Sequence, residues 1–89
     1  NSNPVGAKRA LEVLDTMPGI KVVVTPGMIE LGAEEDKYNK KLGEQISEVA
    51  DYVILIGEKK TKPIMEGLLD KKFDKDKIIF LKGIENKTL

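Results

Sequence analysis

Apolar residues recur at helical spacing in three segments of the chain. In Pro4–Met17 they follow steps of three and four residues, which predicts an amphipathic helix. Asn3 is predicted to cap this helix, and proline suits the first helical position because its missing N–H has no partner there. A second helix is predicted within Ala33–Ala50, and Thr61 is predicted to cap a third. The inward-facing positions expected in the three helices are Ala7, Ala10, Leu11, Leu14 and Met17, then Tyr38, Leu42, Ile46 and Val49, then Ile64, Met65 and Leu68.

Three short apolar runs rich in β-branched residues alternate with these helices. They are Ile20–Thr25, Tyr52–Gly57 and Ile78–Leu81. Continuous apolar runs of this length are typical of strands that are buried on both faces of a parallel sheet. The order α-β-α-β-α-β therefore predicts an α/β, Rossmann-like three-layer domain with a mainly parallel sheet and right-handed crossovers.

At each end of the chain, the alternation of helices and strands stops before an element that an α/β domain would normally have. A capped helix opens at residue 4, where an α/β domain would have a preceding strand for the helix to pack against. Residues 83–89 resemble the start of one more helix. We therefore expect the domain to be truncated at both ends, with residues 1–89 forming a fragment of a larger protein.

Composition removes several classes of function. Fifteen basic and fifteen acidic residues cancel, so no net field attracts nucleic acid or anionic lipid. Cysteine and histidine are both absent, which excludes disulfides, thiolate nucleophiles, histidine bases and most zinc sites. The longest apolar run, Tyr52–Ile56, is far shorter than the roughly 20 residues that span a bilayer. We expect no nucleic acid and no membrane as partners, and a cytoplasmic location.

The loop after the first strand, Gly27–Gly32, is the main candidate for chemistry, because open α/β sheets bind ligands at the carboxyl ends of their strands. It has a G-x-x-x-x-G frame, but Ala33 and Glu34 follow where a phosphate-binding P-loop has lysine and a hydroxyl residue. Glu30 would also repel a phosphate. Taken alone, these residues favour a loop whose two glycines supply positive φ, with Glu30 solvated.

The remaining polar clusters are weaker candidates. Lys59, Lys60 and Lys62 surround a helix N-terminus and could hold an anion, but lysines in such a pattern more often form a solvated face, which is the interpretation favoured here. Asn86–Thr88 matches a glycosylation sequon, which chance explains in so short a chain. No acid pair, nucleophile with a base, or metal cluster can be assembled, so we assign no catalytic residue and no metal ligand.

Two stretches resemble a known enzyme family. The sequence N-S-N-P at Asn1–Pro4, followed by an alanine- and leucine-rich helix, is similar to the end of the D-x-Y-N-x-N-P motif that opens the carboxy-terminal domain of the Mur ligases. The sequence V-V-V-T-P-G-M-I-E-L-G at Val22–Gly32 resembles the strand and G-D-M-x-E-L-G loop of the MurF branch. The similarity continues in order to about Leu81 and so covers most of the chain.

The resemblance implies a three-domain cytoplasmic ligase that adds D-Ala-D-Ala to UDP-MurNAc-tripeptide in peptidoglycan synthesis. The family uses ATP and Mg2+ to convert a carboxylate to an acyl phosphate, which the incoming amine attacks. This chain would be part of the carboxy-terminal domain, which delivers the dipeptide and closes over a nucleotide held by the central domain. ATP and Mg2+ would bind mainly outside it. Its partners would be the other domains of its own parent chain and the two substrates, and alone it would be inactive and without a bound cofactor.

Carried over residue by residue, the resemblance identifies few positions. Pro26 and Gly27 stand where the family motif has glycine and aspartate, and Asn39 stands where many relatives have histidine. The implied substrate- or nucleotide-facing residues are Asn1, Ser2, Asn3, Gly27, Met28 and Glu30.

Two alternatives remain open. One is a stand-alone α/β module that binds a small ligand or a partner. The other is the equivalent domain of another Mur-like ligase, such as a relative of folylpolyglutamate or cyanophycin synthetase, against which the M-I-E-L-G loop argues.

Overall fold

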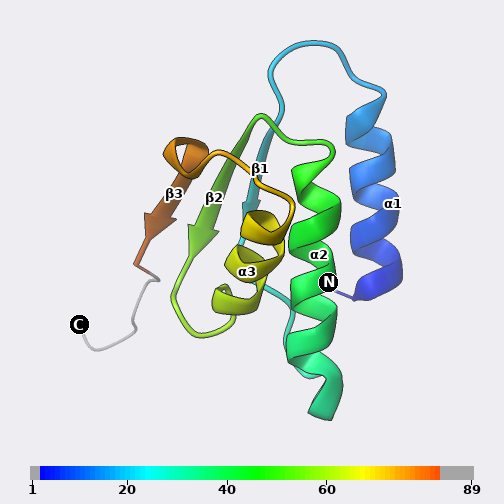
Figure 1. Ribbon diagram of the computed structural model, residues 1–89. Coiled ribbons are helices and arrows are strands. Elements are labelled where there is room, and N and C mark those ends of the chain that lie inside the picture. Colours follow the sequence, from blue (N-terminus) through cyan, green and yellow to red (C-terminus); the bar gives the residue numbers. More distant parts are fainter. Residues whose placement is uncertain (1–2, 83–89) are drawn as a thin grey trace, which may run out of the picture.

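Helices and strands alternate along the chain and build a single parallel sheet (Figure 1). The computed structural model describes residues 3–82. The three strands are parallel and lie in the order β1-β2-β3, which confirms the predicted α/β class. The elements are α1 (Pro4–Asp15), β1 (Val22–Thr25), the short 3-10 helix η1 (Gly32–Glu34), α2 (Glu35–Ser47), β2 (Tyr52–Ile56), α3 (Lys62–Asp70), the 3-10 helix η2 (Lys75–Lys77) and β3 (Ile78–Leu81).

The element boundaries follow the local signals in the sequence closely. The Asn3 side chain caps α1 by accepting a 2.7 Å hydrogen bond from the backbone N–H of Gly6. α1 ends at Asp15, two residues before the predicted end at Met17, and β1 begins at Val22, two residues after the predicted start. The further helix and the sequon expected after residue 82 lie outside the described residues.

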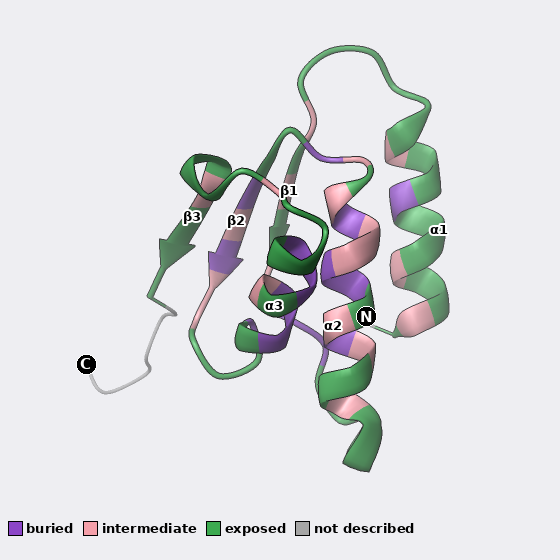
Figure 2. Cartoon of the chain, in the orientation of Figure 1, coloured by how far each residue is buried: buried purple, intermediate pink, exposed green. Residues whose placement is uncertain are grey.

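All three helices lie on one face of the sheet. β1 pairs with β2 and β2 pairs with β3, so both crossovers step in the same direction across the sheet. Right-handed crossovers that step in one direction place their helices on the same face, here α2 and α3. α1 packs beside α2 on this side and contributes Leu11 to the core. Figure 2 shows buried positions concentrated where the helices meet the sheet.

The opposite face of the sheet is uncovered among residues 3–82. Val53 and Leu55 point toward the helices and are fully buried, whereas the alternate positions Val24 and Ile79 keep 55% and 44% of their surface exposed. The expectation of strands buried on both faces is therefore wrong for this sheet. The described residues form two layers, and the third layer of the predicted architecture has no counterpart among them.

Two glycines bring the backbones of α2 and α3 into contact. A Cβ atom on Gly43 would lie 2.1 Å from the carbonyl oxygen of Ile64, and one on Gly67 would lie 2.1 Å from that of Lys40. Each helix therefore places a glycine against the backbone of the other. Ile46 of α2 and Leu68 of α3 are fully buried in the core, which also contains Val53 and Leu55 of β2.

Replacing Gly43 with alanine tests this contact. We expect Gly43→Ala to lower the free energy of unfolding by about 3 kcal/mol, because a new methyl group would overlap rigid backbone rather than a flexible side chain. Chemical denaturation followed by circular dichroism measures the change. Gly6→Ala in α1 is the control, and its effect should stay within about 1 kcal/mol of wild type. Equal effects of the two substitutions would contradict the close packing.

Candidate functional site

The β1–α2 loop turns sharply three times at the carboxyl edge of the sheet. Gly27 and Gly32 have φ values of 90° and 68°, which confirms the prediction that the two glycines supply positive φ. Glu30 also has a positive φ, 64°, although it carries a side chain. A left-handed conformation costs such a residue roughly 1 kcal/mol, so the surrounding contacts must hold the loop in place.

A single buried side chain fixes the middle of this loop. Asn39, on α2, is fully buried. Its Oδ1 accepts a hydrogen bond of 2.8 Å from the backbone N–H of Met28, and its Nδ2 donates one of 2.9 Å to the Met28 carbonyl. Both polar groups of the Met28 backbone are thus satisfied by one amide. The Met28 side chain is only 3% exposed and packs into the core.

The loop is also joined to the neighbouring β2–α3 loop. Gly27 lies so close to Lys60 that an added Cβ would be 2.8 Å from the Lys60 carbonyl oxygen. The Lys60 ammonium forms an ion pair with Glu35 at the start of α2. The hydrogen bond from Lys60 is the largest cause that lowers the pKa of the Glu35 carboxyl, and the same contact raises the pKa of Lys60. The two loops therefore form one connected edge.

Thr61 supports the β2–α3 loop in a different way from the one predicted. It occupies the N-cap position of α3 and is fully buried, but its side chain accepts no hydrogen bond from the helix. Its hydroxyl instead donates to the carbonyl of Gly57, at 2.5 Å. Thr61 therefore closes the loop at its base rather than capping the helix.

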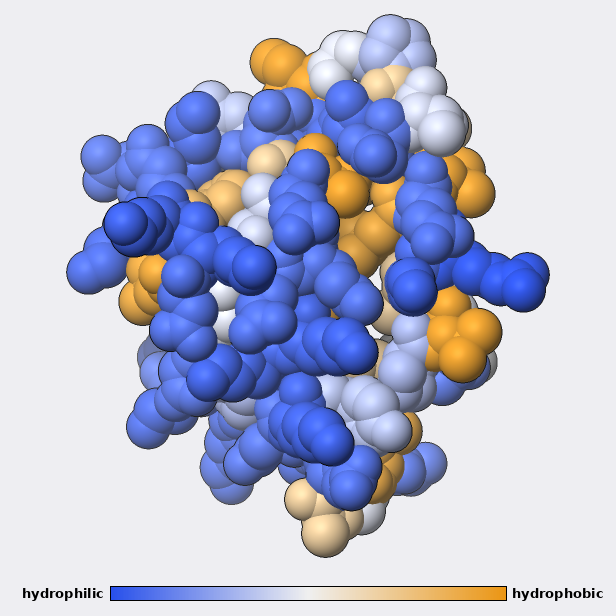
Figure 3. Space-filling view, turned by 45° about the vertical axis from the view of Figure 1, so that its right-hand side comes forward, coloured by the Kyte–Doolittle hydropathy of each residue, from blue (hydrophilic) through white to orange (hydrophobic). Residues whose placement is uncertain are grey.

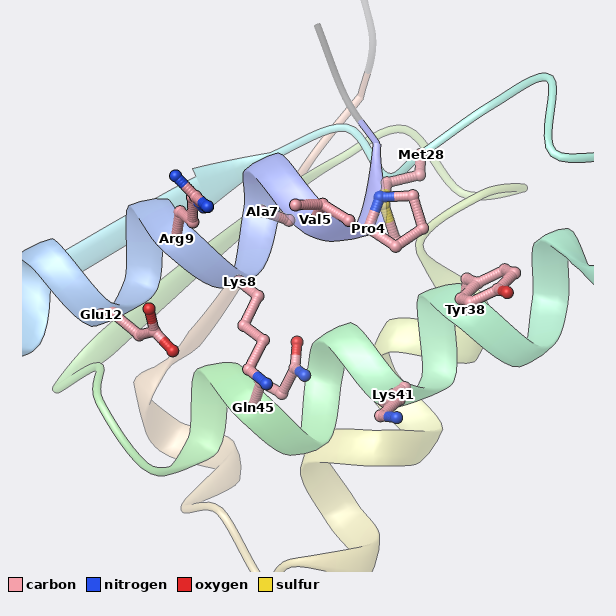
Figure 4. Close-up of a pocket in the computed structure, with 10 residues that line it drawn as sticks. All are labelled: Pro4, Val5, Ala7, Lys8, Arg9, Glu12, Met28, Tyr38, Lys41 and Gln45. Atoms are coloured by element: carbon pink, nitrogen blue, oxygen red, sulfur yellow. The ribbon is translucent and has the colours of Figure 1, made fainter.

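A half-open groove runs between α1 and α2 at this end of the molecule. Its volume is about 410 Å3. Figure 3 brings the α1 side forward and shows hydrophobic surface between two columns of hydrophilic side chains. The close-up in Figure 4 shows its lining residues on the two helices, with Met28 beside Pro4. Pro4 directly follows the N-S-N stretch, and Met28 belongs to the M-I-E-L-G loop, so the groove brings the two motifs together.

The other predicted site residues have separate environments. Asn1 and Ser2 lie outside the described residues. Asn3 is exposed and its Oδ1 caps α1, whereas Gly27 packs against Lys60. Glu30 is exposed on the loop. Lys59 and Lys62 are exposed and form no ion pair within residues 3–82, in agreement with a solvated face.

The sequence motifs did not indicate that Asn39 holds the β1–α2 loop in place. The resemblance drew attention to Asn39 only as the position of a histidine in relatives. A signal was present, because Asn39 stands three residues before Leu42 and seven before Ile46, on the inward stripe of α2. A polar residue on a buried stripe must find hydrogen-bond partners. The identity of those partners depends on how the loop folds back, which helical spacing does not reveal.

Residues 3–82 lack the side-chain cluster of a metal site, and the glycine loop lacks the sequence of a P-loop. Residues 3–82 contain no group of three or more acidic, cysteine or histidine side chains placed to bind a metal ion. Beside the glycine loop, Lys60 is paired with Glu35, whereas Lys59 and Lys62 are exposed. In the same range, no helix is long and apolar enough to cross a membrane. Comparison of the chain with protein-family models and with curated proteins finds no match.

The clamp on Met28 can be tested by removing its amide. We expect Asn39→Leu to lower the free energy of unfolding by about 2–4 kcal/mol, because two buried backbone groups lose their partners and each costs about 1–3 kcal/mol. Urea denaturation of the variant and wild type measures this. Gln45→Leu, on the same helix, is the control and should change stability by less than about 1 kcal/mol. A loss no larger than that of the control would show that the clamp is dispensable.

The ion pair between Lys60 and Glu35 predicts a dependence on pH. The pKa of Glu35 lies below its ordinary value of 4.5, so its stabilising effect is complete above pH 4.5 and is lost as the pH falls through the lower pKa of the folded state. We expect Glu35→Gln to lose less stability than wild type on acidification from pH 4.5 downward. Denaturation curves at a series of pH values measure both slopes. Glu34→Gln should follow wild type, and a Glu35→Gln slope identical to wild type would exclude the pair as the cause.

Proposed function

We propose that the chain is part of the carboxy-terminal domain of a cytoplasmic, MurF-like ligase that joins D-Ala-D-Ala to UDP-MurNAc-tripeptide. The observation that carries the proposal is the meeting of two stretches at one groove. Pro4, after N-S-N, and Met28, in M-I-E-L-G, lie 24 residues apart and line the same groove at the carboxyl edge of the sheet. These are the stretches on which the family resemblance depends.

The position of the groove supports a role in delivering a substrate. The strands end and all three helices begin at this edge of the molecule (Figure 1). In open α/β sheets this edge is where ligands bind. The loop there is held by Asn39 and by the contact between Gly27 and Lys60, so it forms a rigid surface. A rigid surface can hold an amine in line with a carboxyl group activated by another domain.

The chemistry of this surface suits positioning rather than phosphate transfer. Residues 3–82 contain no group of acidic, cysteine or histidine side chains placed to bind Mg2+, and the glycine loop lacks the lysine and hydroxyl residue of a P-loop. ATP and Mg2+ would be held by the central domain of the parent protein, where they would activate the carboxylate. Glu30 is exposed on the loop and could accept a hydrogen bond from the ammonium group of the incoming dipeptide.

The activity is tested with the parent protein that carries this chain. ADP release is measured with ATP, Mg2+, UDP-MurNAc-tripeptide and D-Ala-D-Ala, and mass spectrometry follows the product. We expect ADP release to require both substrates and the product to gain one dipeptide. Omission of D-Ala-D-Ala is the control. ADP release without the dipeptide, or no product with it, would refute the ligase assignment.

The role of Glu30 is a separate prediction. In the parent enzyme we expect Glu30→Gln to raise the KM for D-Ala-D-Ala about tenfold, since one charge-assisted hydrogen bond of about 1.4 kcal/mol is weakened. The KM for ATP should stay unchanged. Steady-state kinetics with each substrate varied in turn measures the two values. Unchanged kinetics for the dipeptide would leave Glu30 a part of the loop alone.

A further inference from the structure

The groove between α1 and α2 combines an apolar floor with unpaired cations. Val5 and Ala7 contribute apolar surface, and the Tyr38 ring forms part of the wall. Lys8 and Lys41 line the groove from opposite helices. In Figure 4 the Lys8 side chain extends from α1 toward α2.

The electrostatic balance of the groove differs from that of the whole chain. Fifteen basic and fifteen acidic residues cancel overall. The groove has three cationic residues, Lys8, Arg9 and Lys41, against a single carboxylate, Glu12. In Figure 4 Arg9 points away from the gap, whereas Lys8 extends from α1 toward α2 and the Lys41 side chain lies on the outer side of α2. Within residues 3–82 neither lysine forms an ion pair, so both charges are available to an incoming anion.

The size of the groove favours a small molecule over a protein partner. Its volume of about 410 Å3 falls in the range of about 300–1,000 Å3 that is usual for small-molecule sites. Ten residues line it, whereas each side of a stable protein interface has about 20–30. A peptide or protein would therefore find too little surface here.

We propose that the groove binds a small anion with an apolar body, such as an aryl or alkyl carboxylate or phosphate monoester. The apolar body lies on Val5 and Ala7 beside the Tyr38 ring, and the anionic head lies at the rim of the groove that carries Lys8 and Lys41. The apolar contact supplies affinity through burial of surface, and the two ammonium groups select the sign of the charge. This site does not depend on the ligase reaction, and its test requires no turnover.

The test is a titration of the 89-residue chain with phenylbutyrate, followed by amide NMR spectra. We expect shifts at Ala7, Lys8, Lys41 and Gln45, with a dissociation constant on the order of 1 mM for so small a probe. Phenylbutylamine carries the same apolar body with the opposite charge, and acetate carries the carboxylate alone. Both should bind at least about tenfold more weakly, since each lacks one half of the recognition. Comparison with phenyl phosphate then distinguishes a carboxylate site from a phosphate site.

A pair of matched variants links the binding to the two lysines. The double substitution Lys8→Gln and Lys41→Gln should weaken phenylbutyrate binding about tenfold. The control is Lys71→Gln with Lys75→Gln, which removes the same charge at exposed positions outside the groove and should change binding less than about twofold. Equal weakening by both pairs would overturn the proposal. So would equal binding of phenylbutylamine in wild type, or shifts that cluster elsewhere.

Discussion

The contact between the backbones of α2 and α3 determines the positions of most other elements. Gly43 and Gly67 let the two helices approach until each glycine touches a carbonyl of the other helix. The pair then covers Val53 and Leu55 of the central strand as one apolar surface. A wider separation would leave a gap above β2 and would shift the N-termini of both helices. The loops at the carboxyl edge depend on those N-termini, so packing in the core sets the geometry of the edge.

That geometry is held by polar contacts together with the burial of the Met28 side chain in the core. Asn39 forms hydrogen bonds with both backbone polar groups of Met28, and the Thr61 hydroxyl donates to a carbonyl within the β2–α3 loop. The ion pair between Lys60 and Glu35 connects the β2–α3 loop to the start of α2. The arrangement explains how Glu30 can stay in a left-handed conformation. It also separates two tasks. The β1–α2 loop supplies a fixed surface, whereas the groove between α1 and α2 supplies exposed charged side chains. Substitution of those charged side chains can therefore leave the conformation of the loop intact.

Much of this fold could be predicted from the sequence because its signals are local. Apolar spacing and short β-branched runs indicated the three described α-helices and the three strands, with bounds that differ by a few residues, and the two loop glycines have the predicted positive φ. The two 3-10 helices, η1 and η2, were not predicted. The covering of the sheet could not be predicted in the same way. A strand with a continuous apolar sequence can have one or both faces of its sheet buried. The direction of the crossovers decides whether helices cover one face or both. The roles of Asn39 and Gly43 depend on residues distant in the sequence, which no local spacing encodes.

The sheet face that residues 3–82 leave exposed also affects how stability varies with temperature. The heat-capacity change of unfolding grows with the apolar surface that becomes exposed, and is about 1.1–1.3 kcal/mol/K for a typical chain of 89 residues. Side chains such as Val24 and Leu81 already have half of their surface in water in the folded state. Their hydration changes less on unfolding, which reduces their contribution to the heat-capacity change. A smaller heat-capacity change makes the free energy of unfolding vary less with temperature, so exposed strand residues broaden the stability curve.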